Sequence, residues 1–94
     1  MMYEQTVFFY PNQIPDKVIS SIIELSNSSG IKINYHAEHF KTIAGKETMV
    51  FPCLLVFGIS ELTIKEAVTK VSDLLIKNGG RIARVSIISK IFVC

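Results

Sequence analysis

The sequence has few of the residues that build covalent or metal-held frameworks. Its 94 residues include two cysteines, Cys53 inside an apolar run and Cys94 at the end. Cysteines this far apart predict neither a disulfide framework nor a metal-ligand spacing, so both are expected to be reduced. No metal site and no cofactor is predicted.

Strong net charge and long apolar runs are also missing. Ten basic and eight acidic residues give a formal charge of +2, without a run of one sign, which argues against a nucleic-acid partner. The longest apolar run, residues 49–59, is about half of the roughly 20 residues that a membrane-spanning helix needs. The first residues lack a basic segment followed by an apolar one, so no secretory signal is predicted. We therefore expect a cytoplasmic protein without a membrane partner.

Motifs that would identify a chemistry are absent too. The five glycines form neither of the common phosphate-binding loops, and no serine lies in a G-x-S-x-G turn. A nucleophilic role for Cys53 would need a base beside it, whereas Pro52 and Leu54 flank it, so a core position is expected. No catalytic residue is assigned.

What the sequence does contain is a regular alternation of strand and helix patterns. Apolar residues recur at helical spacing in residues 15–28 and 63–77, and glycines follow both segments. Ser60 or Thr63 can cap the second helix, and Thr63 with Glu66 fits a capping box. Alternating or continuous apolar residues predict four strands, at residues 6–10, 31–37, 50–57 and 82–93.

The order of these elements predicts a fold class. With right-handed crossovers, β-α-β-β-α-β packs most simply as a ferredoxin-like α+β sandwich, with a four-stranded antiparallel sheet and two helices on one face. We expect one domain, residues 1–94. Strand 50–57 should be central, because both its odd-numbered and its even-numbered positions are apolar. The connection through residues 38–47 is polar, and its boundaries are the hardest to place.

RNA-recognition modules share this element order, but this chain lacks their signature. Their third strand begins with a basic residue and a glycine and exposes aromatic side chains that stack on bases. Residues 49–58 lack both leading residues. Phe51 and Phe57 share a face, which packing explains better, so no nucleic-acid partner is expected.

Two histidines and a carboxylate form the densest polar cluster, at His36, Glu38 and His39. In a strand, His36 and Glu38 share one face while His39 points the other way, so the three do not converge. An enzyme that uses His36 or His39 as general acid or base is therefore the weakest of three hypotheses. We expect that the protein is not an enzyme.

The leading hypothesis is a non-enzymatic interaction or regulatory module. The helices can cover one face of the sheet. The other face would carry every second apolar residue of strand 50–57, together with Ile88 and Phe92. An apolar surface of that extent predicts an interface, either in a homo-oligomer or with another protein. Ile88 and Phe92 are the predicted interface residues.

The alternative, from another class, is a small-molecule-binding domain. Its pocket would lie at the sheet face or at a subunit interface. Tyr35, His36 and Arg84 would supply the polar contacts to the ligand.

Overall fold

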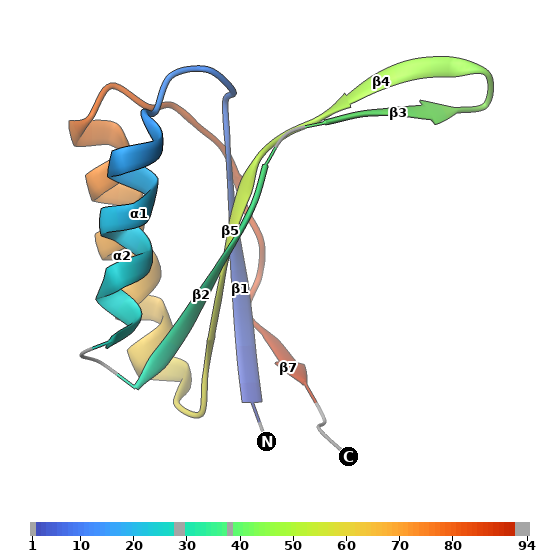
Figure 1. The fold of residues 1–94 in the computed structure, drawn as a ribbon. Coiled ribbons are helices and arrows are strands. Elements are labelled where there is room, and N and C mark those ends of the chain that lie inside the picture. The colour runs from blue at the N-terminus through green and yellow to red at the C-terminus, as the bar shows by residue number, and fades with distance from the viewer. Residues whose placement is uncertain (1, 28–29, 38, 92–94) are drawn as a thin grey trace.

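The chain folds into a twisted antiparallel sheet with two helices on one side and a projecting hairpin (Figure 1). The computed structural model describes residues 2–27, 30–37 and 39–91. Its helices are α1 (Asp16–Glu24), followed by a 3-10 turn (Leu25–Asn27), and α2 (Glu61–Lys77). Its strands are β1 (Met2–Phe9), β2 (Ile31–His36), β3 (His39–Ile43), β4 (Lys46–Val50), β5 (Cys53–Gly58), β6 (Ile82–Val85) and β7 (Ser89–Ile91).

The main sheet has the strand order β2-β5-β1-β6, and β7 also pairs with β1. Every pairing is antiparallel. Both helices cover the same face (Figure 1). The predicted α+β class, the antiparallel sheet with both helices on one face and the central position of the most apolar strand are therefore confirmed. That strand begins at Cys53, directly after Pro52, which has no N–H for the ladder.

The core lies between the helices and the sheet. Leu54 and Val56 of β5 and Val7 of β1 are fully buried there. The apolar stripes predicted for the two helices supply the other side of the core. Their buried members are Ile19, Ile22, Ile64, Val68, Val71 and Leu75.

The ends of α2 follow from local hydrogen bonding. The Ser60 hydroxyl accepts a hydrogen bond from the Thr63 N–H at 3.3 Å, so Ser60 is the cap and the capping box predicted at Thr63 is wrong. At the other end, Gly79 has a φ of 88°, and the Gly80 N–H donates to the Leu75 carbonyl at 2.8 Å. This left-handed turn satisfies a carbonyl that the helix leaves open. No helix in the described ranges is long and apolar enough to cross a membrane.

A second, two-stranded sheet replaces the polar connection expected at residues 38–47. Strands β3 and β4 pair with each other in a regular register around a two-residue turn. Both turn residues have positive φ, 52° at Ala44 and 79° at Gly45, as in a type I′ turn. The hairpin reaches beyond the main sheet, on the side away from the helices (Figure 1).

The strand expected at residues 82–93 is divided into β6 and β7. The Ser86 N–H donates to the Thr6 carbonyl, and the Thr6 N–H donates to the Ser86 hydroxyl, both at 2.9 Å. The next pair in the register is Glu4 with Ser89. Gln5 therefore lies opposite two residues instead of one, which is a β-bulge.

This bulge corrects the orientation predicted for Ile88. A one-residue slip moves the following side chains to the other face of a sheet. Ile88 accordingly packs against the core on the helix side, whereas Ile87 is 85% exposed. The expected outward orientation of Ile88 is therefore wrong, and its part in an interface stays a prediction. Phe92 lies outside the described residues.

Candidate binding site on the outer face of the sheet

The outer face of the sheet, which points away from the helices, is mainly apolar at its centre, although Glu4 and Thr6 of β1 also point outward there. Side chains alternate along a strand. The residues that lie between the core residues of β1 and β5 therefore point outward. Most are half-buried, and Cys53 is buried. We call the following residues the outer-face cluster: Met2, Phe8, Cys53, Leu55, Phe57 and Ile91.

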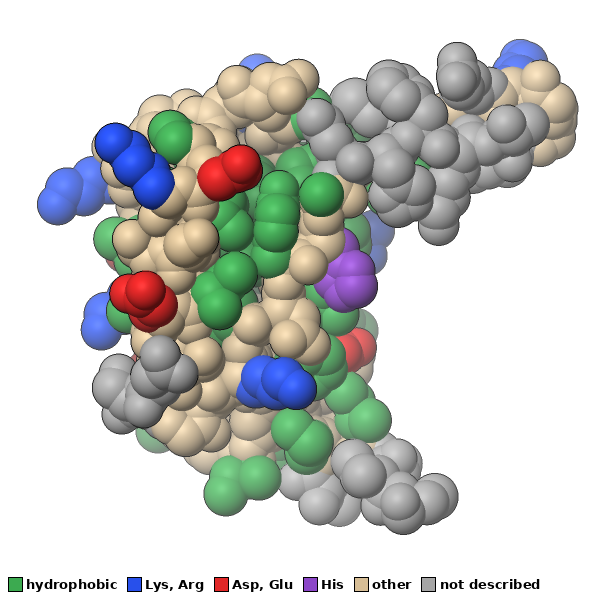
Figure 2. Space-filling view, in the orientation of Figure 1, with side chains coloured by type: hydrophobic (Ala, Val, Ile, Leu, Met, Phe, Trp, Pro, Cys, Tyr) green, Lys and Arg blue, Asp and Glu red, His purple; other side chains and the backbone are tan. Residues whose placement is uncertain are grey.

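Polar residues flank this cluster on both edges of the sheet. Lys32, Asn34 and His36 extend along β2, and Arg84 lies on β6. In the space-filling view, charged side chains are visible both over the helices and along the sheet (Figure 2). An apolar centre with a polar rim is the usual anatomy of a protein interface.

Two of the three predicted ligand residues lie on this face, in one row across the sheet. His36 pairs with Cys53, Cys53 with Phe8, and Phe8 with Arg84. Three strand spacings separate His36 from Arg84, about 14 Å. Tyr35 lies on the helix face, where its ring stacks on Phe9 with the centroids 6.4 Å apart. The three side chains therefore do not converge on one ligand.

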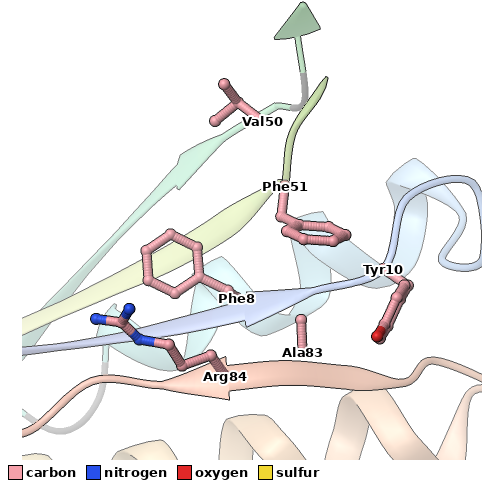
Figure 3. Close-up of a pocket in the computed structure, with 6 residues that line it drawn as sticks. All are labelled: Phe8, Tyr10, Val50, Phe51, Ala83 and Arg84. Atoms are coloured by element: carbon pink, nitrogen blue, oxygen red, sulfur yellow. The ribbon is translucent and has the colours of Figure 1, made fainter. Parts of the chain in front are cut away.

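A cavity of about 500 Å³ opens on the outer face at the Arg84 end of this row (Figure 3). Aromatic rings form most of its wall, and Arg84 supplies a charge. The rings of Tyr10 and Phe51 meet edge to face, 5.2 Å between centroids. The lining residues are Phe8, Tyr10, Val50, Phe51, Ala83 and Arg84.

Two irregularities of the backbone create this cavity. Between Phe8 and Phe9 the register with β6 shifts, so Ala83 and Arg84 both reach the cavity, although they are consecutive. The chain is also irregular between β4 and β5, where Phe51 and Pro52 belong to neither strand. The Pro52 carbonyl accepts a hydrogen bond from the Phe9 N–H at 3.1 Å. Phe51, which lies between the two strands, turns its ring toward Tyr10 (Figure 3).

Two guanidinium groups lie against the rings of this region. The Cζ atom of Arg84 is 5.7 Å from the centroid of Phe8, and that of Arg81 is 4.9 Å from the centroid of Tyr10. Both distances lie within the range of cation–π attraction. Among the described residues, the one ion pair joins Lys65 to Glu61 on α2, so neither arginine is neutralised by a described carboxylate.

The remaining chemistry of this face is modest. Burial raises the pKa of the Cys53 thiol, which disfavours the nucleophilic thiolate. Within the described ranges, no three His, Cys, Asp or Glu side chains gather as metal ligands would. His36 is exposed, and the side chain of His39 and all of Glu38 and Cys94 lie outside the description.

Of the residues that line this cavity, Arg84 alone was predicted from the sequence as a ligand contact, and that role stays a prediction; the aromatic wall was not predicted. Phe8 and Tyr10 alternate with core residues in the first strand, and that alternation could have placed them together on the outer face. Phe51 was attributed to packing. The bulge that brings Ala83 beside Arg84 has no signal in the sequence.

Comparisons with known proteins support the fold alone. No protein-family model matches the sequence, and no curated protein matches it. The divalent cation tolerance protein Cut A1 from Thermus thermophilus is similar in structure, with a TM-score of 0.50 at 13% identity over 97% of this chain and 84% of that chain. CutA from Pyrococcus horikoshii, in the presence of 3 M guanidine hydrochloride, aligns with a TM-score of 0.42 at 13% identity over 93% of this chain and 84% of that chain. The chain thus shares the ferredoxin-like α+β fold of the Thermus protein.

Proposed function

We propose that the protein is a non-enzymatic interaction module that acts as a homo-oligomer. The observation that carries this proposal is the outer-face cluster. The helices cover the opposite face of the sheet, so no described helix covers this one (Figure 1). Burying apolar surface contributes roughly 25 cal/mol per Å², which favours association through this face.

The hairpin supports the same proposal. Strands β3 and β4 pair with each other and with no other described strand. A lone two-stranded hairpin is marginally stable in water, and its outer edges offer unpaired N–H and C=O groups. A second copy of the chain can supply both the missing strand partner and an apolar face of matching character. A symmetric assembly needs only this one kind of surface.

The test is a charge placed in the middle of the outer-face cluster. Leu55 lies between Thr6 and Asn34 on the central strand β5, and its side chain points outward. Leu55→Glu should reduce the molar mass measured by light scattering to that of one chain, because a buried unpaired carboxylate is strongly unfavourable. Leu62→Glu is the matched control, since Leu62 is 68% exposed on α2.

The control should keep the wild-type mass. Far-UV circular dichroism and a cooperative thermal transition verify that both variants fold. A folded Leu55→Glu protein with unchanged mass would contradict association through this face. Equal dissociation of both variants would contradict it as well.

The cavity at Arg84 favours a second function, small-molecule binding. Its volume of about 500 Å³ lies in the range of roughly 300–1,000 Å³ that is common for ligand sites. Apolar walls with a single charged side chain are also typical of such sites. Of the residues predicted from the sequence, Arg84 belongs to this site, and His36 lies at the far edge of the same face.

A further inference from the structure

We infer that the cavity binds a planar organic anion, an aromatic carboxylate being the simplest member of the class. This inference rests on the second function above, small-molecule binding at the outer face. It does not depend on the oligomeric state. It adds the chemical class of the ligand and the residues that select it.

The planarity of the ligand follows from the rings that form the wall. Phe8, Tyr10 and Phe51 present ring faces and edges around one concavity, and the small side chain of Ala83 leaves its floor open (Figure 3). Aromatic rings prefer edge-to-face or offset-stacked neighbours with centroids about 4.5–7 Å apart. The Tyr10–Phe51 pair, at 5.2 Å and an interplanar angle of 73°, already has the edge-to-face arrangement that the ring of a ligand could extend.

The negative charge of the ligand follows from the two arginines. Arg84 lines the cavity, and the guanidinium of Arg81 lies over the ring of Tyr10, one of the wall residues. The Tyr10 N–H donates to the Arg81 carbonyl at 2.9 Å, which ties this arginine to the cavity through the backbone. Neither guanidinium has a described carboxylate within ion-pair distance. A carboxylate entering the cavity can therefore form the paired hydrogen bonds for which a guanidinium is shaped.

The surroundings strengthen this preference for an anion. No acidic residue in the described part of the chain lines the cavity. An anion beside Arg84 would therefore form its charge pair without a competing carboxylate among the described wall residues. A neutral planar molecule would keep the stacking but lose this charge pair.

The test compares three probes of similar size by isothermal titration calorimetry with the full chain. The probes are 2-naphthoate, its neutral amide 2-naphthamide, and the non-planar anion decalin-2-carboxylate. We expect 2-naphthoate to bind at least about tenfold more tightly than either of the others, the ratio expected for one hydrogen bond to a charged group. Arg84→Gln should lower the affinity for 2-naphthoate by the same factor, and Arg84→Lys should lower it by less.

Lys32→Gln is the matched control variant. It also removes one positive charge from the outer face, but it lies four residues along β2 from His36, about 13 Å from the row that contains Arg84. It should leave the affinity for 2-naphthoate unchanged. Because Arg84, Arg81 and Lys32 are all exposed, these substitutions should not prevent folding, and Arg81→Gln provides a second variant of the site.

Several results would overturn the inference. Equal binding of naphthoate and naphthamide would leave a small-molecule site but remove the anion selectivity. If Lys32→Gln weakens the binding of 2-naphthoate as much as Arg84→Gln does, the anion binds elsewhere or is attracted without specificity. No binding of any probe would overturn both the ligand class and small-molecule binding by this cavity, while self-association is judged separately from the mass.

Discussion

The Cζ atom of Arg84 lies 5.7 Å from the centroid of the Phe8 ring, on the strand next to it. The two residues form a cross-strand pair on the outer face, where Phe8 also belongs to the apolar cluster. This pair therefore links the cavity to the surface that we propose for self-association. A substitution at either residue should affect the two functions to different extents.

For Arg84, the expected effect on stability is small. Arg84→Met keeps an unbranched apolar stem but loses the charge, so the free energy of unfolding should fall by about 0.5–1 kcal/mol, the value of an exposed cation–π pair. Urea denaturation measures the change, with Arg84→Lys as the charge-retaining control. A loss above about 2 kcal/mol would mean that Arg84 makes a buried interaction which the single chain does not show.

The core can be tested with two leucines that differ in burial. Leu54 is fully buried on β5, whereas Leu62 is 68% exposed on α2. Leu54→Ala should lower the free energy of unfolding by about 2–5 kcal/mol, because it leaves a cavity among core side chains. Leu62→Ala should change it by no more than about 0.5 kcal/mol. Similar losses from both variants in chemical denaturation would contradict the placement of the helices on the sheet.

The hairpin turn offers a stabilising substitution. Ala44 has a φ of 52°, a conformation that costs an ordinary L-residue about 1–2 kcal/mol and that asparagine adopts more readily. Ala44→Asn should increase the protection of amide hydrogens in β3 and β4 against exchange. Ala44→Val, which is β-branched, should decrease it. A valine variant with equal or greater protection would argue against the type I′ turn.

Cys53 predicts a dependence of stability on pH. Burial raises the pKa of its thiol, so the folded chain holds this proton at pH values where the unfolded chain loses it. The contribution of the thiol to stability is complete below the unfolded pKa of about 8.5 and is lost as the pH rises through the folded value. Wild type should therefore lose more stability than Cys53→Ala between neutral and alkaline pH. Parallel losses, measured by urea denaturation, would contradict a buried thiol.

The sequence was sufficient to predict the parts of the fold that depend on periodicity. The continuous apolar run that contains Leu54 and Val56 predicted a central strand, and both residues are fully buried. The turn at Ala44 was missed because it lacks the Asn-Gly or Asp-Gly pair that usually marks a type I′ hairpin. The inward turn of Ile88 was missed because the bulge beside Gln5 depends on tertiary pairing with β1, which the local pattern does not encode.

The candidate site could be predicted only in part, because it depends on tertiary pairing as the bulge does. Arg84 was predicted from the sequence as a polar contact to a ligand, but its neighbours in the cavity come from segments that only the folded sheet brings together. Phe51 and Arg84 are far apart in the sequence, yet they line one cavity. Tyr35 was expected there, although the alternation along β2 places it on the helix face, against Phe9.

The molar mass of the wild-type chain in dilute solution tests the proposed self-association most directly. Sedimentation equilibrium over a range up to about 100 µM shows any dependence of assembly on concentration. Because the outer-face cluster needs a partner, we expect a mass of at least twice the 10.5 kDa of one chain. A mass of 10.5 kDa throughout that range would contradict the proposal that a second copy covers this face.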